Sequence, residues 1–298
     1  MTVLRNALTV DVEDYFQVSA FDSHIPRDTW ASQPCRVDRS TNRILDLFAR
    51  NNVSATFFVL GWVAERYPGL VSRIQNDGHE VASHGYTHKK VTQLKPDEFR
   101  NEVIRSKSLL EDICGVLVKG YRAPSYSIDS RNLWALDILN EAGYSYSSSI
   151  YPIHHDHYGM PNAPRFAHYP RANNLLEIPI ATLPISRWNM PCGGGGYFRL
   201  FPYRLSCWAI KRVNVLEKKP CVFYFHPWEI DPDQPRQSGL NRRTRFRHYL
   251  NLHRTEFRIA RLLNDFSWGR MDNIYLDTNE TFPRIPVHVV KNNAPNAR

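Results

Sequence analysis

The sequence predicts an α/β fold built from parallel β-α-β units. Short, β-prone apolar runs alternate with segments of helical periodicity at least four times in the first half of the chain. The chain has 298 residues, which is enough for one large α/β domain. Its content of 42% hydrophobic and 22% charged residues is typical of a folded globular protein. We therefore expect disorder only at the ends, as in the polar tail 291–298.

The individual elements follow from local apolar patterns and from residues that begin or end helices. Pro96 is suited to the first turn of a long helix, and Gly143 follows the end of a later one. The expected strands are 7–10, 53–60, 78–82, 116–120, 177–180 and 221–225. The expected helices are 42–50, 61–75, 95–114 and 129–139.

The alternation stops after residue 145. Residues 151–173 contain four prolines, four histidines and few periodic apolar positions, so we predict a long functional loop. Its histidines 154, 155 and 157 are interpreted as facing a substrate rather than as a second metal site. The glycine run 193–196 predicts a flexible segment or a close approach of two backbones. It lacks the lysine and the spacing of nucleotide-binding loops, which argues against a nucleotide site.

The chain is basic, with a formal net charge of +9 and a pI near 9.4. Such a surface favours acidic partners: an anionic glycan, a phosphorylated lipid carrier, a membrane surface or nucleic acid. No nucleic-acid-binding motif accompanies the charge, so we do not expect nucleic acid as a partner. Much of the charge lies in one stretch, Arg242, Arg243, Arg245, Arg247, Arg254, Arg258 and Arg261. Apolar residues recur in it at roughly helical spacing, which predicts a helix that docks on the core with its arginines outward: Phe246, Leu250, Phe257, Ala260 and Leu263.

Cysteine usage and the N-terminus bear on the compartment. The five cysteines are scattered without metal-binding or disulfide-type spacing, which suits a reducing compartment. No apolar leader is visible at the N-terminus, and no run of 18 apolar residues occurs. These features lead us to expect a cytoplasmic protein.

Four polar clusters come directly after expected strands. The carboxyl ends of parallel strands meet at one edge of a sheet or barrel, so these clusters are expected to converge. Each cluster alone has a common structural explanation, such as an acidic turn, unrelated histidines, a buried ion pair or a core histidine. Their ordered recurrence favours a shared site. The clusters are Asp11-Val12-Glu13-Asp14, Ser83-His84-Gly85-Tyr86-Thr87-His88, Tyr121-Arg122-Ala123-Pro124-Ser125-Tyr126 and Phe225-His226-Pro227-Trp228.

The residue types in these clusters suit metal-assisted hydrolysis. His84 and His88, four residues apart, can meet on one face of a helical turn and present neutral imidazoles to one ion. The acidic cluster can add a carboxylate ligand and still spare a base, and Arg122 can orient a carboxylate through paired hydrogen bonds. Two histidines and one carboxylate leave coordination positions open, as a catalytic zinc site needs. The joint prediction is a mononuclear metal hydrolase.

The four motifs resemble those of the polysaccharide deacetylase family, the NodB-homology carbohydrate esterases, over about residues 5–230. The resemblance implies a distorted (β/α)7 barrel over residues 1–240, with a basic C-terminal extension, 241–298, packed on it and frayed at its end. It also implies an N-acetylated glycan as substrate and a divalent metal, with Zn²⁺ as the expected ion. The matching motifs are Thr9-Val10-Asp11-Val12-Glu13-Asp14, His84 with His88, Arg122 with Pro124, and Phe225-His226.

Further segments are similar to one branch of this family, the deacetylases encoded beside exosortase-type exopolysaccharide systems. This resemblance implies a role in exopolysaccharide biosynthesis and contact with a membrane surface or a lipid-linked glycan. The segments are Asp11-Val12-Glu13-Asp14-Tyr15-Phe16, Ser148-Ser149-Ile150-Tyr151-Pro152, Gly194-Gly195-Gly196-Tyr197-Phe198-Arg199 and His226-Pro227-Trp228-Glu229-Ile230.

The resemblance also implies residue roles. Asp11 is the expected base, Arg122 orients it, and His226 is the expected acid. The expected metal ligands are His84, His88 and a carboxylate from Glu13 or Asp14. The adjacent aspartates usual in the family are spread here over three acids; alternation along an extended chain favours Glu13, and Asp14 would then cap the next helix or bind substrate. The expected substrate-binding residues are Pro124, Tyr126, Tyr197 and Trp228, with Tyr15 as a further candidate for stacking on sugar rings.

Three other functions are compatible with the same residues. A relative acting on another linear or cyclic amide, as in allantoinase-like proteins, would keep the metal site and change the substrate. A non-catalytic glycan-binding barrel would show broken motifs, and none is clearly broken here. A binder of nucleic acid or membrane surfaces would use the arginine-rich stretch without needing a metal.

Overall fold

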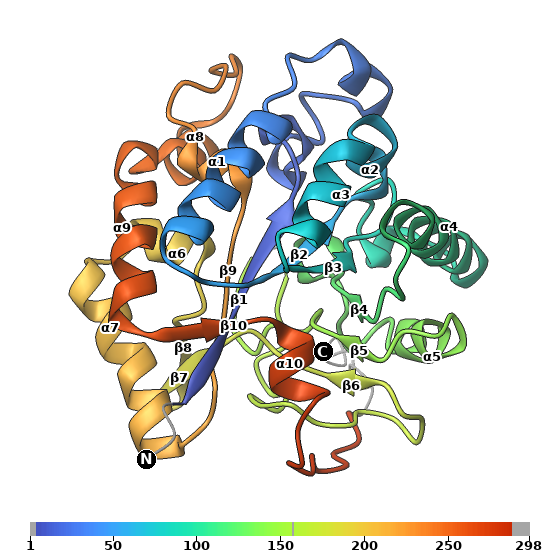
Figure 1. Ribbon diagram of the computed structural model, residues 1–298, viewed down its shortest axis with the longest axis vertical. Coiled ribbons are helices and arrows are strands. Elements are labelled where there is room, and N and C mark those ends of the chain that lie inside the picture. Colours follow the sequence, from blue (N-terminus) through green and yellow to red (C-terminus); the bar gives the residue numbers. More distant parts are fainter. Residues whose placement is uncertain (1–3, 157, 288–298) are drawn as a thin grey trace, which may run out of the picture.

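The computed structural model describes residues 4–156 and 158–287. Its centre is a parallel sheet with the strand order β10-β1-β2-β3-β4-β5-β6, in which β9 also pairs with β1 (Figure 1). This confirms the predicted α/β class. The strands of this sheet are β1 (Arg5–Val12), β2 (Thr56–Val59), β3 (Glu80–Ser83), β4 (Gly120–Tyr121), β5 (Tyr146–Ser147), β6 (Leu176–Glu177), β9 (Val222–Phe225) and β10 (Ser267–Gly269).

The sheet has the curl of the expected barrel without a closed ladder, since strand pairing among the described residues does not join β6 to β9 or β10. The long strand β1 lies in its middle. It pairs with β10 near its start, with β9 over residues 7–10 and with β2 over residues 9–12. Seven of its eight residues are buried, as expected for a parallel strand covered on both faces.

Helices surround the sheet (Figure 1). One helix was expected over 61–75, but two short helices form instead because Pro68 begins the second. A proline disfavours a helical conformation in the preceding residue, and Tyr67 has φ −128° and ψ 57°. The α-helices are α1 (Val37–Arg50), α2 (Gly61–Arg66), α3 (Pro68–Asn76), α4 (Pro96–Cys114), α5 (Trp134–Glu141), α6 (Gly195–Leu200), α7 (Tyr203–Arg212), α8 (Arg242–Tyr249), α9 (Leu252–Asp265) and α10 (Met271–Tyr275).

Several short elements join these. The loop expected over 151–173 has no helix or extended strand among its described residues. After it comes an antiparallel hairpin, which sequence patterns did not indicate, formed by β7 (Thr182–Ile185) and β8 (Trp188–Pro191). The 3-10 helices are η1 (Tyr15–Gln17), η2 (Ser19–Phe21), η3 (Arg27–Ser32), η4 (Val91–Gln93), η5 (Pro124–Tyr126) and η7 (Pro227–Ile230), and η6 (Val213–Glu217) is a π-helix that continues α7.

The C-terminal segment takes part in the sheet instead of only packing on it. Strand β10 pairs with β1, and α10 follows it against the barrel. The backbone N–H of Met271 donates to Thr56 Oγ1 at 2.8 Å, and that of Asp272 donates to Glu80 Oε2 at 3.1 Å. These bonds connect the chain after residue 240 to β2 and β3. The pairing of β10 with β1 gives the sheet eight strands where seven were expected.

The apolar stripe predicted for the arginine-rich stretch is correct only in part: Leu263 is buried and Ala260 packs against the core, but Phe246 and Phe257 do neither. Asn251 adopts a left-handed conformation with φ 55° and separates α8 from α9, so the helical phase changes between them. Phe246 and Phe257 consequently point outward and are exposed. The residues that α9 buries are Leu252, Thr255, Ile259, Leu262 and Leu263.

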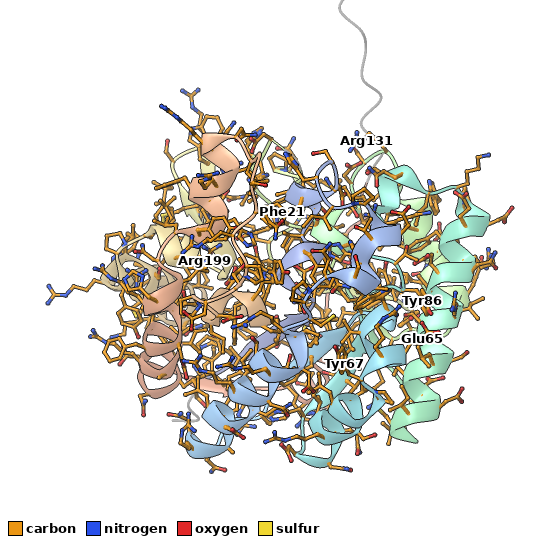
Figure 2. The ribbon with its side chains drawn as sticks, turned by 90° about the horizontal axis from the view of Figure 1, so that it is seen from above. Phe21, Glu65, Tyr67, Tyr86, Arg131 and Arg199 are labelled. Atoms are coloured by element: carbon orange, nitrogen blue, oxygen red, sulfur yellow. The ribbon has the colours of Figure 1, made fainter. Side chains whose placement is uncertain are left out.

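Seen from above, side chains fill the space between sheet and helices, with Arg199 inside the molecule and Arg131 at its edge (Figure 2). None of the helices in the described ranges is both long enough and apolar enough to cross a bilayer. All five cysteines are free thiols.

Candidate active site

Two of the three acids at the carboxyl end of β1 face one cavity. Asp11 is the second-last residue of β1 and lies opposite Phe58 of β2. Glu13 follows two residues later, just after the strand. Both side chains line a cavity of about 360 Å³ at the carboxyl ends of the strands. The alternation of side chains along an extended chain therefore brings the expected base and the favoured carboxylate ligand to the same side.

Asp14 points elsewhere. Its Oδ1 accepts the backbone N–H of Tyr15 at 2.8 Å, and its Oδ2 accepts those of Arg36 and Val37 at 2.6 and 2.8 Å. Burial raises the pKa of Asp14 to about 6, against the opposing effect of these N–H donors. The expectation that Asp14 is an alternative metal ligand does not agree with this geometry, because its carboxylate caps η1 and the start of α1.

His84 and His88 meet across a tight loop rather than on a helical turn. Gly85 and His88 adopt left-handed conformations with φ 77° and 56°, which bend the chain back after β3. Arg27 holds this bend by donating to the carbonyl oxygens of Thr87 and His88 at 3.0 and 3.1 Å. The two imidazole centroids lie 5.2 Å apart.

The geometry around His84 favours metal binding. Its Nδ1 lies 2.9 Å from the carbonyl oxygen of Arg122, so an Nδ1–H donates there and leaves Nε2 as the free lone pair. Burial lowers the pKa of His84 to about 4, so its imidazole is neutral near pH 7. A neutral imidazole is the form that coordinates a metal.

Glu13, His84 and His88 together fit a divalent metal ion. One ligand atom of each lies within 4.8 Å of the others, and all three side chains are buried. Glu13 Oε2 and His88 Nε2 are 2.6 Å apart, yet Glu13 Oε2 is a buried oxygen for which the described residues supply no hydrogen-bond donor. Burial by itself would raise the pKa of Glu13, but His88, His226 and His84 lower it well below its usual range, so the carboxylate is ionised. A cation between these atoms would satisfy the orphaned oxygen.

Arg122 connects the expected base to the wall of the barrel. Its side chain is 0% exposed, and its Nη1 donates to Asp11 Oδ1 at 2.6 Å and to Thr9 Oγ1 at 2.7 Å. Its Nε and Nη2 donate to the carbonyl oxygen and Oγ of Ser148 at 3.2 and 3.1 Å. The fork of the guanidinium group thereby fixes one oxygen of Asp11 and leaves Oδ2 directed at the cavity.

His226 lies on the other side of the same centre. Its Nε2 is 3.6 Å from Glu13 Oε1 and 3.9 Å from Asp11 Oδ2, while its Nδ1 is 3.3 Å from Glu229 Oε1. Burial would lower the pKa of His226, but the carboxylates of Glu13 and Glu229 outweigh it and raise this pKa to about 9. The side chain is therefore protonated at neutral pH and can act as an acid.

Three of the side chains expected to contact substrate are largely or fully buried, and of these only Trp228 lines the cavity. Trp228 is largely buried, stacks on both His226 and His248, and donates its indole N–H to Glu13 Oε1 at 3.2 Å. Tyr15 is fully buried against Phe16. Pro124 is buried and does not line the cavity. Little of these side chains is left for a sugar ring to stack on.

Other predicted residues do line the cavity. Tyr197, from α6, is half-buried and presents its ring to it. Tyr126 lines it with a buried hydroxyl that has no hydrogen-bond partner in the part of the chain that the structure describes. Both Ser125 and Tyr126 have positive φ, 54° and 49°. Of the loop histidines, His155 lines the cavity and stacks on Tyr158, His154 packs against Trp188, and residue 157 lies outside the described residues.

Sequence motifs did not assign a role to several residues that support the site. Glu229 contacts His226, and Arg199 Nε lies 3.6 Å from Glu229 Oε1 although both are buried. Thr9 and Ser148 accept hydrogen bonds from Arg122. Two sequence features could have indicated these residues: Glu229 lies three residues after His226, and Arg199 follows the glycine run 193–196. A buried charge needs a partner nearby, so a charged residue close to a predicted site residue is a candidate partner.

Two family matches divide the chain. Residues 28–147 match the family described as Polysaccharide deacetylase, and residues 148–276 match one described as Domain of unknown function (DUF3473). The first match contains His84, His88 and Arg122, whereas Asp11 precedes it and His226 lies in the second. The site therefore draws residues from both matched regions.

Characterised relatives match a limited part of the chain. A peptidoglycan-N-acetylglucosamine deacetylase of Bacillus cereus is 39% identical over 98 residues, which cover 33% of this chain and 36% of that protein. A chitooligosaccharide deacetylase of Bradyrhizobium sp. is 35% identical over 100 residues, which cover 33% of this chain and 43% of that protein. The matched part is thus less than half the length of either relative.

Structural similarity extends over nearly the whole chain. The crystal structure of a putative polysaccharide deacetylase from Mycobacterium smegmatis superposes with a TM-score of 0.61 at 19% sequence identity, covering 97% of this chain and 99% of that chain. The two proteins share a fold, including the C-terminal elements after residue 240.

Proposed function

We propose that this protein is a metal-dependent hydrolase that removes N-acetyl groups from sugar residues of a polysaccharide. The proposal starts from the polysaccharide deacetylase family, which the family match and the relatives support. The observation that carries the proposal is the convergence of Glu13, His84 and His88 on one point with the Asp11–Arg122 pair beside it. Three ligands leave a coordination position open, and Asp11 is held beside them as a base. Such a site suits hydrolysis better than a purely structural metal site.

Glu13, His84 and His88 would hold the ion, for which we propose Zn²⁺. Two nitrogen ligands and one carboxylate oxygen suit this metal and leave positions open for water and substrate. A bound ion would polarise the acetamide carbonyl and make water more acidic. Trp228 and Arg122 would keep the ligands in place, since they hold Glu13 Oε1 and the Nδ1 of His84.

Asp11 acts as the base in this proposal. Its Oδ2 is directed at the cavity and takes a proton from the attacking water, while Arg122 holds Oδ1. The hydroxide adds to the acetamide carbonyl carbon. His226 then gives the proton on Nε2 to the departing nitrogen as the C–N bond breaks, which yields acetate and a free amino sugar. Glu229, at Nδ1, orients the His226 ring for this transfer.

The turn after Arg122 is the proposed place for a backbone donor to the developing oxyanion. The N–H groups of Ala123 and Tyr126 are engaged, with Ser149 Oγ and with the carbonyl oxygen of Ala123, and Pro124 has no N–H. Ser125 therefore remains as the candidate donor. Its strained conformation, φ 54°, is consistent with a backbone position retained for function.

The substrate is proposed to be an N-acetylated glycan of an exopolysaccharide pathway, in finished or lipid-linked form. Tyr197 and Tyr126 are the aromatic side chains placed to contact sugar rings in the cavity. The motifs around Ser148 and Gly194, from which this pathway is inferred, lie outside the polysaccharide deacetylase match and within the second matched region.

The test is metal content and acetate release on purified protein. We expect one divalent ion per chain and chelator-sensitive release of acetate from N-acetylglucosamine oligomers or from N-acetylated polysaccharides. Asp11→Asn should retain the ion and lose activity by about 10²- to 10⁴-fold, as expected for loss of a general base. His84→Ala should lose the ion and the activity together.

His24→Ala is the matched control, because His24 is an exposed histidine outside the cavity. It should keep both metal and rate. Full activity of Asp11→Asn would show that the base is misassigned, and metal binding unchanged by His84→Ala would remove the basis of the proposal.

A further inference from the structure

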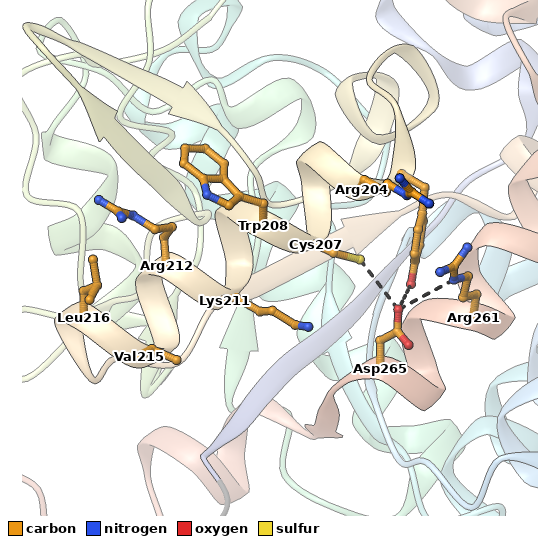
Figure 3. A pocket seen from close by; sticks show the side chains of 10 residues that line it. Arg204, Cys207, Trp208, Lys211, Arg212, Val215, Leu216, Arg261 and Asp265 are labelled. Atoms are coloured by element: carbon orange, nitrogen blue, oxygen red, sulfur yellow. Dashed lines mark hydrogen bonds and ion pairs between the residues drawn. The ribbon is translucent and has the colours of Figure 1, made fainter.

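A second hollow, of about 440 Å³, is separate from the candidate active site. It is formed by α7, the π-helix η6 and the end of α9 (Figure 3), and it shares none of its lining residues with the active-site cavity. We name it the α7 hollow. Its lining residues are Tyr203, Arg204, Cys207, Trp208, Lys211, Arg212, Val215, Leu216, Arg261 and Asp265.

Large apolar side chains project from this hollow into solvent. Trp208 is 44%, Val215 69% and Leu216 60% exposed. These three side chains form an exposed apolar cluster, and contiguous exposed apolar patches often mark interaction sites.

The exposed pair is held outward by an anchored element. Asn214 exchanges amide hydrogen bonds with Asn6 of β1 at 3.1 and 2.8 Å. Glu217 accepts two hydrogen bonds from Arg165 at 2.6 and 2.9 Å, and Val213 is buried. The inward side of η6 is thus fixed at both ends. A π-helix is rare and often marks a functional site, and this one directs Val215 and Leu216 outward.

The hollow is also cationic. Arg204, Lys211, Arg212 and Arg261 line it against one carboxylate, Asp265, which accepts a hydrogen bond from the Tyr203 hydroxyl at 2.7 Å and lies 3.7 Å from Arg261 (Figure 3). Among the described residues no carboxylate forms an ion pair with the other three cations. Helices α8 and α9, whose sequences contain further arginines, lie on the same side of the molecule as α7 (Figure 1).

We propose that the α7 hollow docks the protein on the surface of a membrane containing anionic phospholipids. Tryptophan and aliphatic side chains flanked by unpaired lysine and arginine match the interface of such a bilayer, where apolar groups enter the acyl boundary and cations meet phosphate. The excess of positive charge in the α7 hollow is complementary to the negative charge of anionic phospholipids, which is the reason for choosing this partner. The inference is independent of the proposed hydrolysis, because it uses no residue of the active-site cavity.

Vesicle co-sedimentation of the full chain tests the proposal. The probes are phosphatidylcholine vesicles with and without phosphatidylglycerol. We expect binding only when phosphatidylglycerol is present, and weaker binding as salt concentration rises. A cation near such a surface contributes about a fivefold change in partitioning, so Lys211→Glu with Arg212→Glu should weaken binding by at least about 25-fold. Val215→Ser with Leu216→Ser should weaken it also at high salt.

Two controls match these changes elsewhere on the surface. Arg39→Glu reverses the charge of an exposed arginine on α1, and Leu117→Ser removes an exposed leucine after α4; both should bind vesicles like the unaltered protein. Equal binding by the α7 and control variants, or no binding of the unaltered protein to either vesicle, would overturn the proposal. The proposal would also be overturned if the unaltered protein formed dimers that the α7 substitutions abolish. Binding to an acidic polymer such as heparin, without binding to vesicles, would overturn it as well.

Discussion

The buried pair of Arg122 and Asp11 allows a quantitative test of how the site is held together. Arg122→Met leaves the Asp11 carboxylate, 2% exposed, without its cation and removes the donors to Thr9 and Ser148. Removing one partner of a buried ion pair costs about 3–5 kcal/mol of unfolding free energy. Asp11→Asn should be costly for the converse reason, since it leaves the guanidinium group without a counter-charge.

The double variant removes both charges and so should cost less than the sum of the single ones, by about 2–3 kcal/mol. Urea unfolding followed by tryptophan fluorescence measures each free energy, provided that the urea dependence stays constant. Arg73→Met with Asp46→Asn is the matched control, because this pair is 2.7 Å apart with side chains 39% and 56% exposed, and its coupling should stay below about 1 kcal/mol. Additive effects at Arg122 and Asp11 would refute the idea that the pair acts as a unit.

Three further predictions follow from single positions. Burial raises the pKa of Glu177 to about 7, against the hydrogen bonds from the N–H groups of Ser149 and Ile150 that lower it. The folded state therefore binds this proton more tightly than the unfolded chain, and the free energy of unfolding should fall by up to about 3 kcal/mol as pH rises from about 4.5 to 7. Urea unfolding of Glu177→Gln should show a smaller fall over this pH range, and the same fall in both proteins would contradict the prediction. Gly194 has φ 111° and an added Cβ would collide with the carbonyl oxygen of Tyr224, so Gly194→Ala should destabilise the fold by more than about 1–3 kcal/mol in thermal unfolding. Gly196→Ala should not, because the nearest atom to its Cβ would be Arg199 Nη2 at 3.9 Å. Tyr197→Ala should raise the KM for an N-acetylated oligosaccharide, because Tyr197 lines the cavity. Tyr15→Phe should leave the kinetics unchanged, because the buried hydroxyl of Tyr15 has no hydrogen-bond partner among the described residues. Equal effects of the two changes would contradict the proposed contact of Tyr197 with substrate.

Much of the site was predictable because its residues follow strands. Asp11, His84, Arg122 and His226 each come one or a few residues after a buried apolar run, and parallel strands bring such positions to one edge. The preference for Glu13 over Asp14 also came from local alternation, and the hydrogen bonds of Asp14 agree with it. The expected roles themselves remain proposals.

Stacking roles were less predictable, because a sequence does not tell which face of an aromatic ring is covered. Trp228 follows the strand end as expected, yet His248, twenty residues further along the chain, stacks on it. Tyr15 sits beside the acidic cluster and is nevertheless packed inside the core. Of the expected aromatic contacts, Tyr126, Tyr197 and Trp228 line the cavity, and Trp228 does so with a side chain that is largely buried.

By itself, the sequence determined the α/β class, the order of the main strands and helices, and which polar clusters sit at strand ends, because these depend on periodicities within a few residues. Tertiary structure decided the rest. The pairing of β10 with β1, the contact of Glu229 with His226 and the outward faces of Phe246, Val215 and Leu216 depend on residues distant in the chain or on one left-handed residue that shifts a helical phase. Local patterns carry no information on such contacts, since burial is settled only when the distant surfaces meet.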